Sequence, residues 1–290
     1  MPTTKMSKSR EIRERVDHPI IDADGHMLEL GPIFLDYLRE AGGSTFVERY
    51  LASPASSTEL LRGLTGVSSR WEEARTTRSS TWWNFPTKST LDRASVSLPR
   101  LLHQRLDELG VDFGVLYPTL GFGPTGLEDE EMRRIACRAY NTYVADLYRE
   151  HADRLTPVAI IPMHTPQEAI EEAEYAVKIL GLKAIMIGLV RRPTPGAPPG
   201  SVTAGGRLDT LAFESQFDYD PFWRRCLELG VAPASHTPGM GWGSRRSVSS
   251  YVANHIGSFG ASMEALCRGL FLGGVTRRFP ELSFGMLEGG

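Results

Sequence analysis

Two hydrophobic patterns alternate along the chain: short continuous apolar runs, and longer segments in which apolar residues recur every three or four positions. Segment 128–151 shows the second pattern, since Met132 and Ile135 recur at helical spacing. Another such segment begins at Thr165, which forms a capping pair with Glu168 around a proline at the first helical position. The short runs predict six strands, which begin at Ile20, Val111, Leu155, Lys183, Val231 and Leu282.

The alternation of strand and helix with short links predicts an α/β fold with a parallel sheet. No glycine-rich phosphate loop follows any strand, so a nucleotide-binding fold is not supported. We predict a (β/α)8 barrel of the TIM-barrel type, with about six of its eight strands present. Because an open six-strand barrel leaves two edges unpaired, we expect a fragment of a longer protein, cut just after the sixth strand. The alternative is an open doubly wound sheet, which explains the length but not the polar residues at the strand ends.

The predicted domain organisation has three parts. Residues 1–17 are polar and lack an apolar core stretch, so we expect a disordered N-terminal arm and not a signal peptide. Residues 18–290 are expected to form one incomplete barrel domain. Within it, 44–100 has weak periodicity and predicts an insertion carrying short helices. Its aromatic cluster at 82–85 either packs the insertion against the main body, which we favour, or caps a pocket.

Composition narrows the function. A net charge of -3 does not favour a nucleic-acid or anionic-membrane partner, and no segment is long enough to span a membrane. Cys137, Cys226 and Cys267 are scattered and predict reduced thiols in a cytoplasmic protein. We expect a small-molecule substrate as the partner and allow for a homodimer.

The first strand ends in two acids and a histidine. Residues two apart in a strand point to the same side, so Asp24 and His26 can converge on one point. A carboxylate and an imidazole placed in this way make half of a divalent-metal site. Asp22 has the same parity one pleat deeper and is interpreted as a supporting or packing residue. The same run also fits an ordinary Asp-Gly turn.

Other strand ends also carry side chains that are suited to metal binding or catalysis. His236 closes the fifth strand, where a metal ligand is favoured over a histidine that caps a loop. Glu288 follows the sixth strand and suits a general acid/base or a water-orienting group, or else is only a charge at a strand end. His164 follows the third strand and either lines the pocket or bonds to the turn. His255 lies in a predicted helix, as a substrate contact or an ordinary helix-start residue.

Four stretches carry a resemblance to a known family: 21–26, 154–163, 235–239 and 269–290, the last with Gly-Gly-Val-x-x-Arg-Phe-Pro-Glu-Leu followed by Leu-Glu-Gly-Gly. The chain resembles the amidohydrolase superfamily, in the branch of aminocarboxymuconate-semialdehyde decarboxylase and the resorcylate decarboxylases. The resemblance covers roughly residues 18–290 and is weakest over 44–100. It implies a (β/α)8 barrel with one divalent metal ion, zinc or manganese.

The resemblance also implies residue roles. The first metal motif of the family, His-x-His or Glu-x-His, falls on Asp24 and His26, and the carboxylate favours manganese or another oxygen-tolerant metal over zinc. The third ligand falls on His236. The characterised decarboxylases carry a catalytic histidine where this chain has Glu288, which weakens the expectation of decarboxylation. The last family ligand, an aspartate after strand eight, is expected beyond Gly290.

The resulting functional prediction is a metal-dependent hydrolase or carboxy-lyase, acting on a small cyclic or aromatic acid. The metal would either activate water for hydrolysis or hold the oxygens of an acid undergoing non-oxidative decarboxylation. The alternative is a catalytically inactive fragment or a non-catalytic barrel protein.

Overall fold

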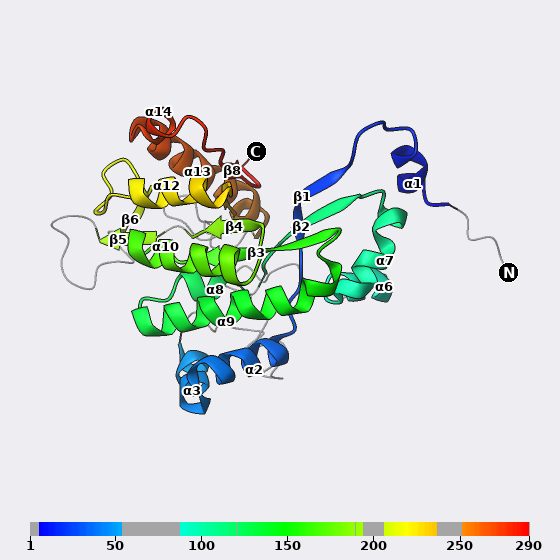
Figure 1. Ribbon diagram of the computed structural model, residues 1–290, viewed down its shortest axis with the longest axis horizontal. Coiled ribbons are helices and arrows are strands. Elements are labelled where there is room, and N and C mark those ends of the chain that lie inside the picture. The colour runs from blue at the N-terminus through cyan, green and yellow to red at the C-terminus, as the bar shows by residue number, and fades with distance from the viewer. Residues whose placement is uncertain are drawn as a thin grey trace.

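The computed structural model describes residues 6–53, 88–119, 121–188, 190–193, 206–236 and 251–289, with the backbone alone over 251–259. The aromatic cluster at 82–85 lies outside these residues. Six strands form one sheet with every pairing parallel, in the order β1-β2-β3-β4-β7-β8 (Figure 1). The strands are β1 (Ile21–His26), β2 (Phe113–Tyr117), β3 (Leu155–Ile161), β4 (Ala184–Ile187), β7 (Pro233–Ser235) and β8 (Gly285–Met286).

The sheet is an open, partial barrel. β1 and β8 are its two end strands, and no pairing joins them within the described ranges. The exposed end of β1 leaves Ile21 57% accessible. The arrangement confirms the predicted (β/α)8 type with six strands, since each parallel crossover carries helices to the outside of the curled sheet.

β3 forms the centre of the core. All seven of its residues are buried, as expected for a parallel strand covered on both faces. β2 pairs with β3 only as far as Pro157. Beyond that point the side chain of Asn141 replaces the neighbouring strand: its amide donates to Ile160 O at 3.0 Å, and its Oδ1 accepts from Ile160 N at 2.8 Å. The backbone polar groups of this buried strand therefore stay paired.

Helices cover the outer face of the sheet, with α9, α10 and α12 side by side in Figure 1. The helices are α1 (Lys8–Arg13), α2 (Gly31–Gly42), α3 (Ser44–Ala52), α6 (Thr90–Ser95), α7 (Pro99–Leu109), α8 (Phe122–Thr125), α9 (Glu130–Tyr148), α10 (Pro166–Glu174), α12 (Asp220–Leu229), α13 (Tyr251–Leu272) and α14 (Val275–Arg278). Two further turns extend α9 and α10: the 3-10 helix η3 (Arg149–His151) and the π-helix η4 (Tyr175–Ile179).

Capping hydrogen bonds and a left-handed glycine set the predicted helix ends. Asp129 caps α9 by accepting from Met132 N at 2.8 Å, and Thr165 caps α10 by accepting from Glu168 N at 3.2 Å. α7 stops at Gly110, whose φ of 74° lies in the left-handed region that glycine adopts without strain.

Three segments differ from the expectation or refine it. Within the arm expected to be disordered, α1 forms because Ser7 caps its start and Arg13 bonds to the carboxylate of Asp112 at 2.6 Å. The same carboxylate also accepts from the backbone N–H of Ile20. The Pro/Gly-rich loop after the fourth strand contains an antiparallel hairpin, β5 (Val190–Pro193) with β6 (Gly206–Asp209). The expected insertion carries short helices in its described parts, α3 and α6. The domain boundaries themselves stay predictions.

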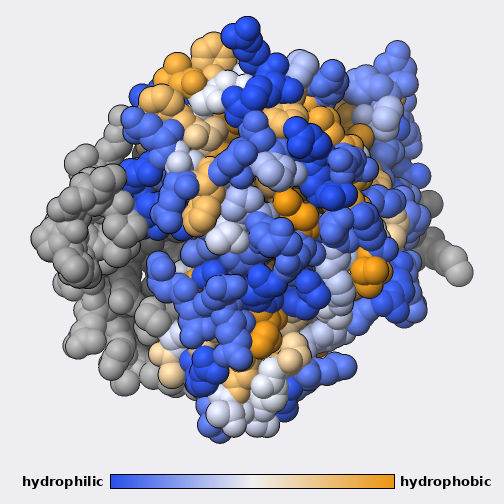
Figure 2. All heavy atoms as spheres, turned by 60° about the vertical axis from the view of Figure 1, so that its left-hand side comes forward, coloured by the Kyte–Doolittle hydropathy of each residue, from blue (hydrophilic) through white to orange (hydrophobic). Residues whose placement is uncertain are grey.

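The face of the molecule seen in Figure 2 is largely polar. In Figure 2, hydrophilic side chains dominate the visible face, and apolar ones appear in small separate groups. Among the described helices, none combines the length and apolar character needed to cross a membrane.

Candidate metal centre

The end of β1 is shaped by a bulge. Its register against β2 shifts between Asp22 and Gly25, so β1 holds one extra residue there. Asp22 closes the bulge by accepting from Asp24 N at 3.1 Å, which makes it a supporting residue. A side chain at Gly25 would place a Cβ 3.0 Å from the carbonyl oxygen of Val115, so a larger residue would force β1 and β2 to shift. This backbone aims Asp24 and His26 at the carboxyl end of the sheet.

The fifth strand brings the third predicted ligand to the same place. β7 is short, and Leu287 N bonds to Ser235 O at 3.0 Å, so His236 emerges directly at the strand end. Its Nε2 lies 2.8 Å from Nε2 of His26 and 3.3 Å from Oδ1 of Asp24. One ligand atom from each of the three residues lies within 4.8 Å of the others. The predicted ligands therefore converge, although metal binding itself stays a prediction.

The donor atoms of this centre suit a divalent cation. Burial lowers the pKa of His26, and the neighbouring His236 lowers it further, which favours neutral imidazole. Two Nε2 atoms 2.8 Å apart can share only one proton, so at least one of them is unprotonated and carries a lone pair. Tetrahedral ligands about 2.0–2.2 Å from zinc lie roughly 3.3–3.6 Å apart. The separation of His236 and Asp24 matches this spacing, and the two histidines lie somewhat closer.

Glu288 lies beside the three candidate ligands. Its Oε2 is 3.9 Å from Nε2 of His236, and its side chain is 30% exposed. The backbone of Glu288 has a φ of 54°, a left-handed conformation that is uncommon outside glycine and is found at functional sites. The next residue, Gly289, packs so closely that a Cβ there would lie 2.9 Å from Cβ of Met263. Glu288 thus follows β8 with its carboxylate close to His236, and its catalytic role stays a prediction.

The comparisons with known proteins place this arrangement in a family. The amidohydrolase family model matches residues 93–290, which contain β2 to β8 with His236 and Glu288. The chain belongs to the amidohydrolase family. The two candidate ligands of β1, Asp24 and His26, precede the matched region.

Solved structures share the fold of this amidohydrolase. An amidohydrolase from Mycobacterium avium subsp. paratuberculosis K-10 matches with a TM-score of 0.57 and 19% identity, over 95% of this chain and 73% of that one. A 5-carboxyvanillate decarboxylase from Novosphingobium aromaticivorans, solved with manganese and 3-methoxy-4-hydroxy-5-nitrobenzoic acid, matches with a TM-score of 0.54 and 14% identity, over 92% and 65%. The 5-carboxyvanillate decarboxylase from Sphingomonas paucimobilis matches with a TM-score of 0.52 and 16% identity, over 92% of this chain and 66% of that one. The chain thus spans about two thirds of the length of the two decarboxylases; the expected truncation stays a prediction.

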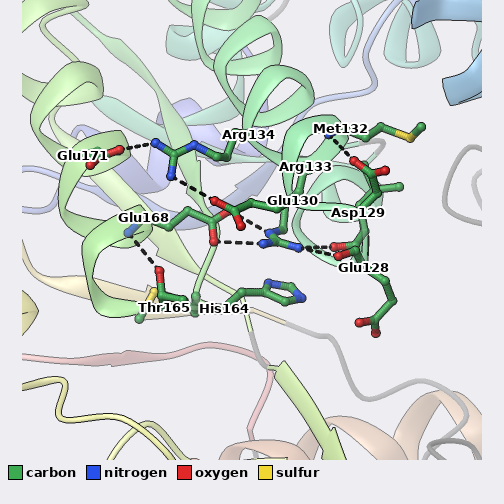
Figure 3. A network of polar contacts seen from close by, with 12 residues as sticks. Glu128, Asp129, Glu130, Met132, Arg133, Arg134, His164, Thr165, Glu168 and Glu171 are labelled. Carbon is green, nitrogen blue, oxygen red and sulfur yellow. Dashed lines mark hydrogen bonds and ion pairs between the residues drawn. The ribbon is translucent and has the colours of Figure 1, made fainter. Parts of the chain in front are cut away.

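The two other predicted histidines of the amidohydrolase stand apart from the ligands. His164 is not in the ligand group; its ring lies beside the pair Arg133–Glu168 (Figure 3), and its carbonyl oxygen accepts from Arg192 at 2.6 Å. Burial, followed by the charges of Arg133 and Arg192, lowers the pKa of His164 to about 3. His164 is therefore neutral near pH 7. The side chain of His255 lies outside the described residues, so the substrate-binding role of both stays a prediction.

A buried ion pair beside His164 was not predicted. Arg133 of α9 and Glu168 of α10 form two parallel bonds of 2.7 and 3.0 Å, with both side chains at most 4% exposed. Nη1 of Arg133 also donates to the carbonyl oxygens of Leu127 and Glu128. The pair is fully satisfied and joins two helices behind the end of β3. Its only sequence signal was the cap at Thr165, because the partners are 35 residues apart.

Glu29 is a second residue that sequence reasoning missed. This carboxylate is 3% exposed and accepts from Thr119 N at 3.0 Å, Gly121 N at 3.2 Å and the hydroxyl of Tyr140 at 2.7 Å. It fixes the turn after β2 against the segment that follows His26. An acid within the apolar stretch 27–30 was the available signal.

A cavity of about 260 Å³ lies elsewhere, between α9 and α10. Its lining includes Arg134, Arg138, Glu171 and Glu172, which are already joined in ion pairs across the two helices. We place the candidate functional site at the strand ends and not in this cavity, because carboxylate and imidazole atoms that could hold an ion converge there.

Proposed function

We propose that the chain is a metal-dependent enzyme that holds one divalent ion, zinc or manganese, through Asp24, His26 and His236. The observation that carries the proposal is the approach of three ligand atoms, within 4.8 Å of one another, at the carboxyl ends of β1 and β7. In a (β/α)8 barrel, this is the end at which catalytic residues gather. The substrate class that we propose is a small cyclic or aromatic acid.

The three side chains have separable tasks. His26 and His236 offer neutral nitrogens, and Asp24 offers the negative charge that partly offsets a dication. An ion bound by this set supplies a Lewis acid that polarises a substrate carbonyl or holds an acidic oxygen. The similar fold of a carboxyvanillate decarboxylase with bound manganese supports a bound divalent ion.

Glu288 is proposed as the group that moves a proton. As a carboxylate it accepts a proton from attacking water, which is the requirement of hydrolysis. As a carboxylic acid it would instead protonate a ring carbon, which is the requirement of non-oxidative decarboxylation. We favour hydrolysis because a carboxylate that is 30% exposed, 3.9 Å from a histidine nitrogen, suits the acceptor role.

The test begins with metal content. The chain is stripped with a chelator, titrated with Mn²⁺ or Zn²⁺ by calorimetry, and analysed by elemental mass spectrometry. We expect about one ion per chain, lost in Asp24→Asn and His236→Gln but kept in His103→Gln, whose histidine bonds to Asp153 on the surface. Equal binding by all variants, or no binding by the parent chain, would overturn the metal site.

The reaction is then assayed with ester and amide panels, and with hydroxybenzoates for release of carbon dioxide. Turnover that requires the added metal supports the enzyme. Metal binding without any turnover would favour the alternative, a non-catalytic or inactive barrel protein.

A further inference from the structure

The imidazole of His236 packs against two aromatic rings. The ring of Tyr117 has its centroid 5.1 Å away at an interplanar angle of 30°, and that of Phe122 lies 5.4 Å away at 36°. These separations fall in the range of favourable offset aromatic packing. His236 is 3% exposed, so the packing surrounds a ring that has little access to solvent.

Hydrogen bonding holds this ring at one nitrogen only, through the 2.8 Å contact of its Nε2 with Nε2 of His26. A metal-binding histidine is usually oriented by its second ring nitrogen, which donates to a carboxylate or a backbone carbonyl. The Nδ1 atom of His236 is buried and has no hydrogen-bond partner in the described part of the chain. Beyond the contact at Nε2, packing is therefore the restraint on its ring plane that the described residues supply.

The two aromatic residues are themselves firmly placed. Tyr117 ends β2 directly opposite His26 in the strand register, and its ring centroid is 6.4 Å from that of His26. Phe122 opens α8 just after the turn in which Glu29 binds the backbone of Thr119 and Gly121. Both rings thus reach His236 from backbone that is anchored to the neighbouring strand end.

We propose that Tyr117 and Phe122 are positioning residues that set the plane of His236, so that its Nε2 faces the metal position between Asp24 and His26. This inference rests on the proposed metal site. The aromatic ring faces carry the effect, and the phenol hydroxyl of Tyr117 is not needed for it.

The experiment measures Mn²⁺ affinity by calorimetry on the chelator-treated full chain. Tyr117→Leu and Phe122→Leu should each weaken binding about tenfold, at the lower end of the range for losing an orienting neighbour of a ligand. Tyr117→Phe keeps the ring and should bind as the parent does. The matched control is Phe34→Leu, which removes a buried ring that packs on Tyr50 and Tyr140 and should lower stability without changing affinity.

A metal-free readout separates this inference from the proposed function. In the ¹⁵N-histidine NMR spectrum of the apo chain, the His236 signals are assigned by their loss in His236→Gln. They should shift in the two leucine variants and stay in place in Tyr117→Phe and Phe34→Leu. If the parent chain bound no Mn²⁺, the proposed function would fail, and the spectrum would still decide the positioning role.

Two results would overturn the inference. One is unchanged Mn²⁺ affinity and unchanged His236 signals in both leucine variants. The other is an equal loss in Tyr117→Phe and Tyr117→Leu, which would assign the effect to the hydroxyl. If Tyr117→Leu fails to fold, Phe122→Met at the partly exposed Phe122 carries the same expectation.

Discussion

Nε2 of His26 lies 2.8 Å from Nε2 of His236, although 210 residues separate them in the chain. The two rings meet edge to face, with centroids 4.6 Å apart. Burial and the proximity of His236 both lower the pKa of His26, which favours the neutral imidazole of His26. At this distance the two nitrogens lie somewhat closer than the roughly 3.3–3.6 Å expected between tetrahedral zinc ligands.

Glu288→Gln should abolish turnover and keep the metal. The amide cannot take a proton from water, so we expect kcat to fall about 100-fold or more, while metal content stays at the level of the parent chain. Glu281→Gln, an exposed glutamate just before β8, is the control and should keep full activity. Full activity of Glu288→Gln would reduce Glu288 to a charge at a strand end.

Gly25→Ala should disturb both stability and metal binding. The added Cβ would lie 3.0 Å from Val115 O, so β1 has to move away from β2, at a cost of about 1–3 kcal/mol. That movement displaces Asp24 and His26, and Mn²⁺ affinity should fall with it. Gly126→Ala is the control, because its Cβ would meet its nearest atom at 3.7 Å. Urea unfolding and calorimetry measure the two effects, and equal behaviour of the two alanine variants would contradict the prediction.

Replacing one partner of the buried pair Arg133–Glu168 should destabilise the fold more than replacing both partners. Arg133→Met leaves the charge of Glu168 buried and unpaired, which typically costs about 3–5 kcal/mol. The double variant Arg133→Met/Glu168→Leu should be more stable than this single variant, because no charge is left behind. Lys178→Met, at an exposed pair with Glu174, should change the unfolding free energy by less than about 1 kcal/mol. A double variant less stable than Arg133→Met would refute this account.

Stability should depend on pH through His164. Its folded pKa of about 3 lies below the ordinary value, so the unfolded chain binds more protons between about pH 6.5 and 3. The contribution of neutral His164 is thus complete above pH 6.5 and is lost progressively as the pH falls. His164→Gln should show a smaller drop in the urea midpoint from pH 7 to 5 than the parent chain, both measured in chelator. His18→Gln, at an exposed histidine, should keep the full drop.

Local sequence determined most of the scaffold and the positions of the candidate ligands. The capping pair at Thr165 and the left-handed Gly110 predicted helix ends because their hydrogen bonds and φ angles involve only near neighbours. Asp24, His26, His236 and Glu288 were predicted from their places at strand ends, since parallel strands present those ends on one side.

Tertiary structure alone decided how those residues meet. The bulge before Gly25, the pair Arg133–Glu168 and the rings of Tyr117 and Phe122 around His236 depend on which strands and helices become neighbours. That order of neighbours is set by packing of the whole sheet, between residues far apart in the chain. The amino-acid pattern places a ligand at the end of a strand, and only the packed barrel fixes the direction in which it points.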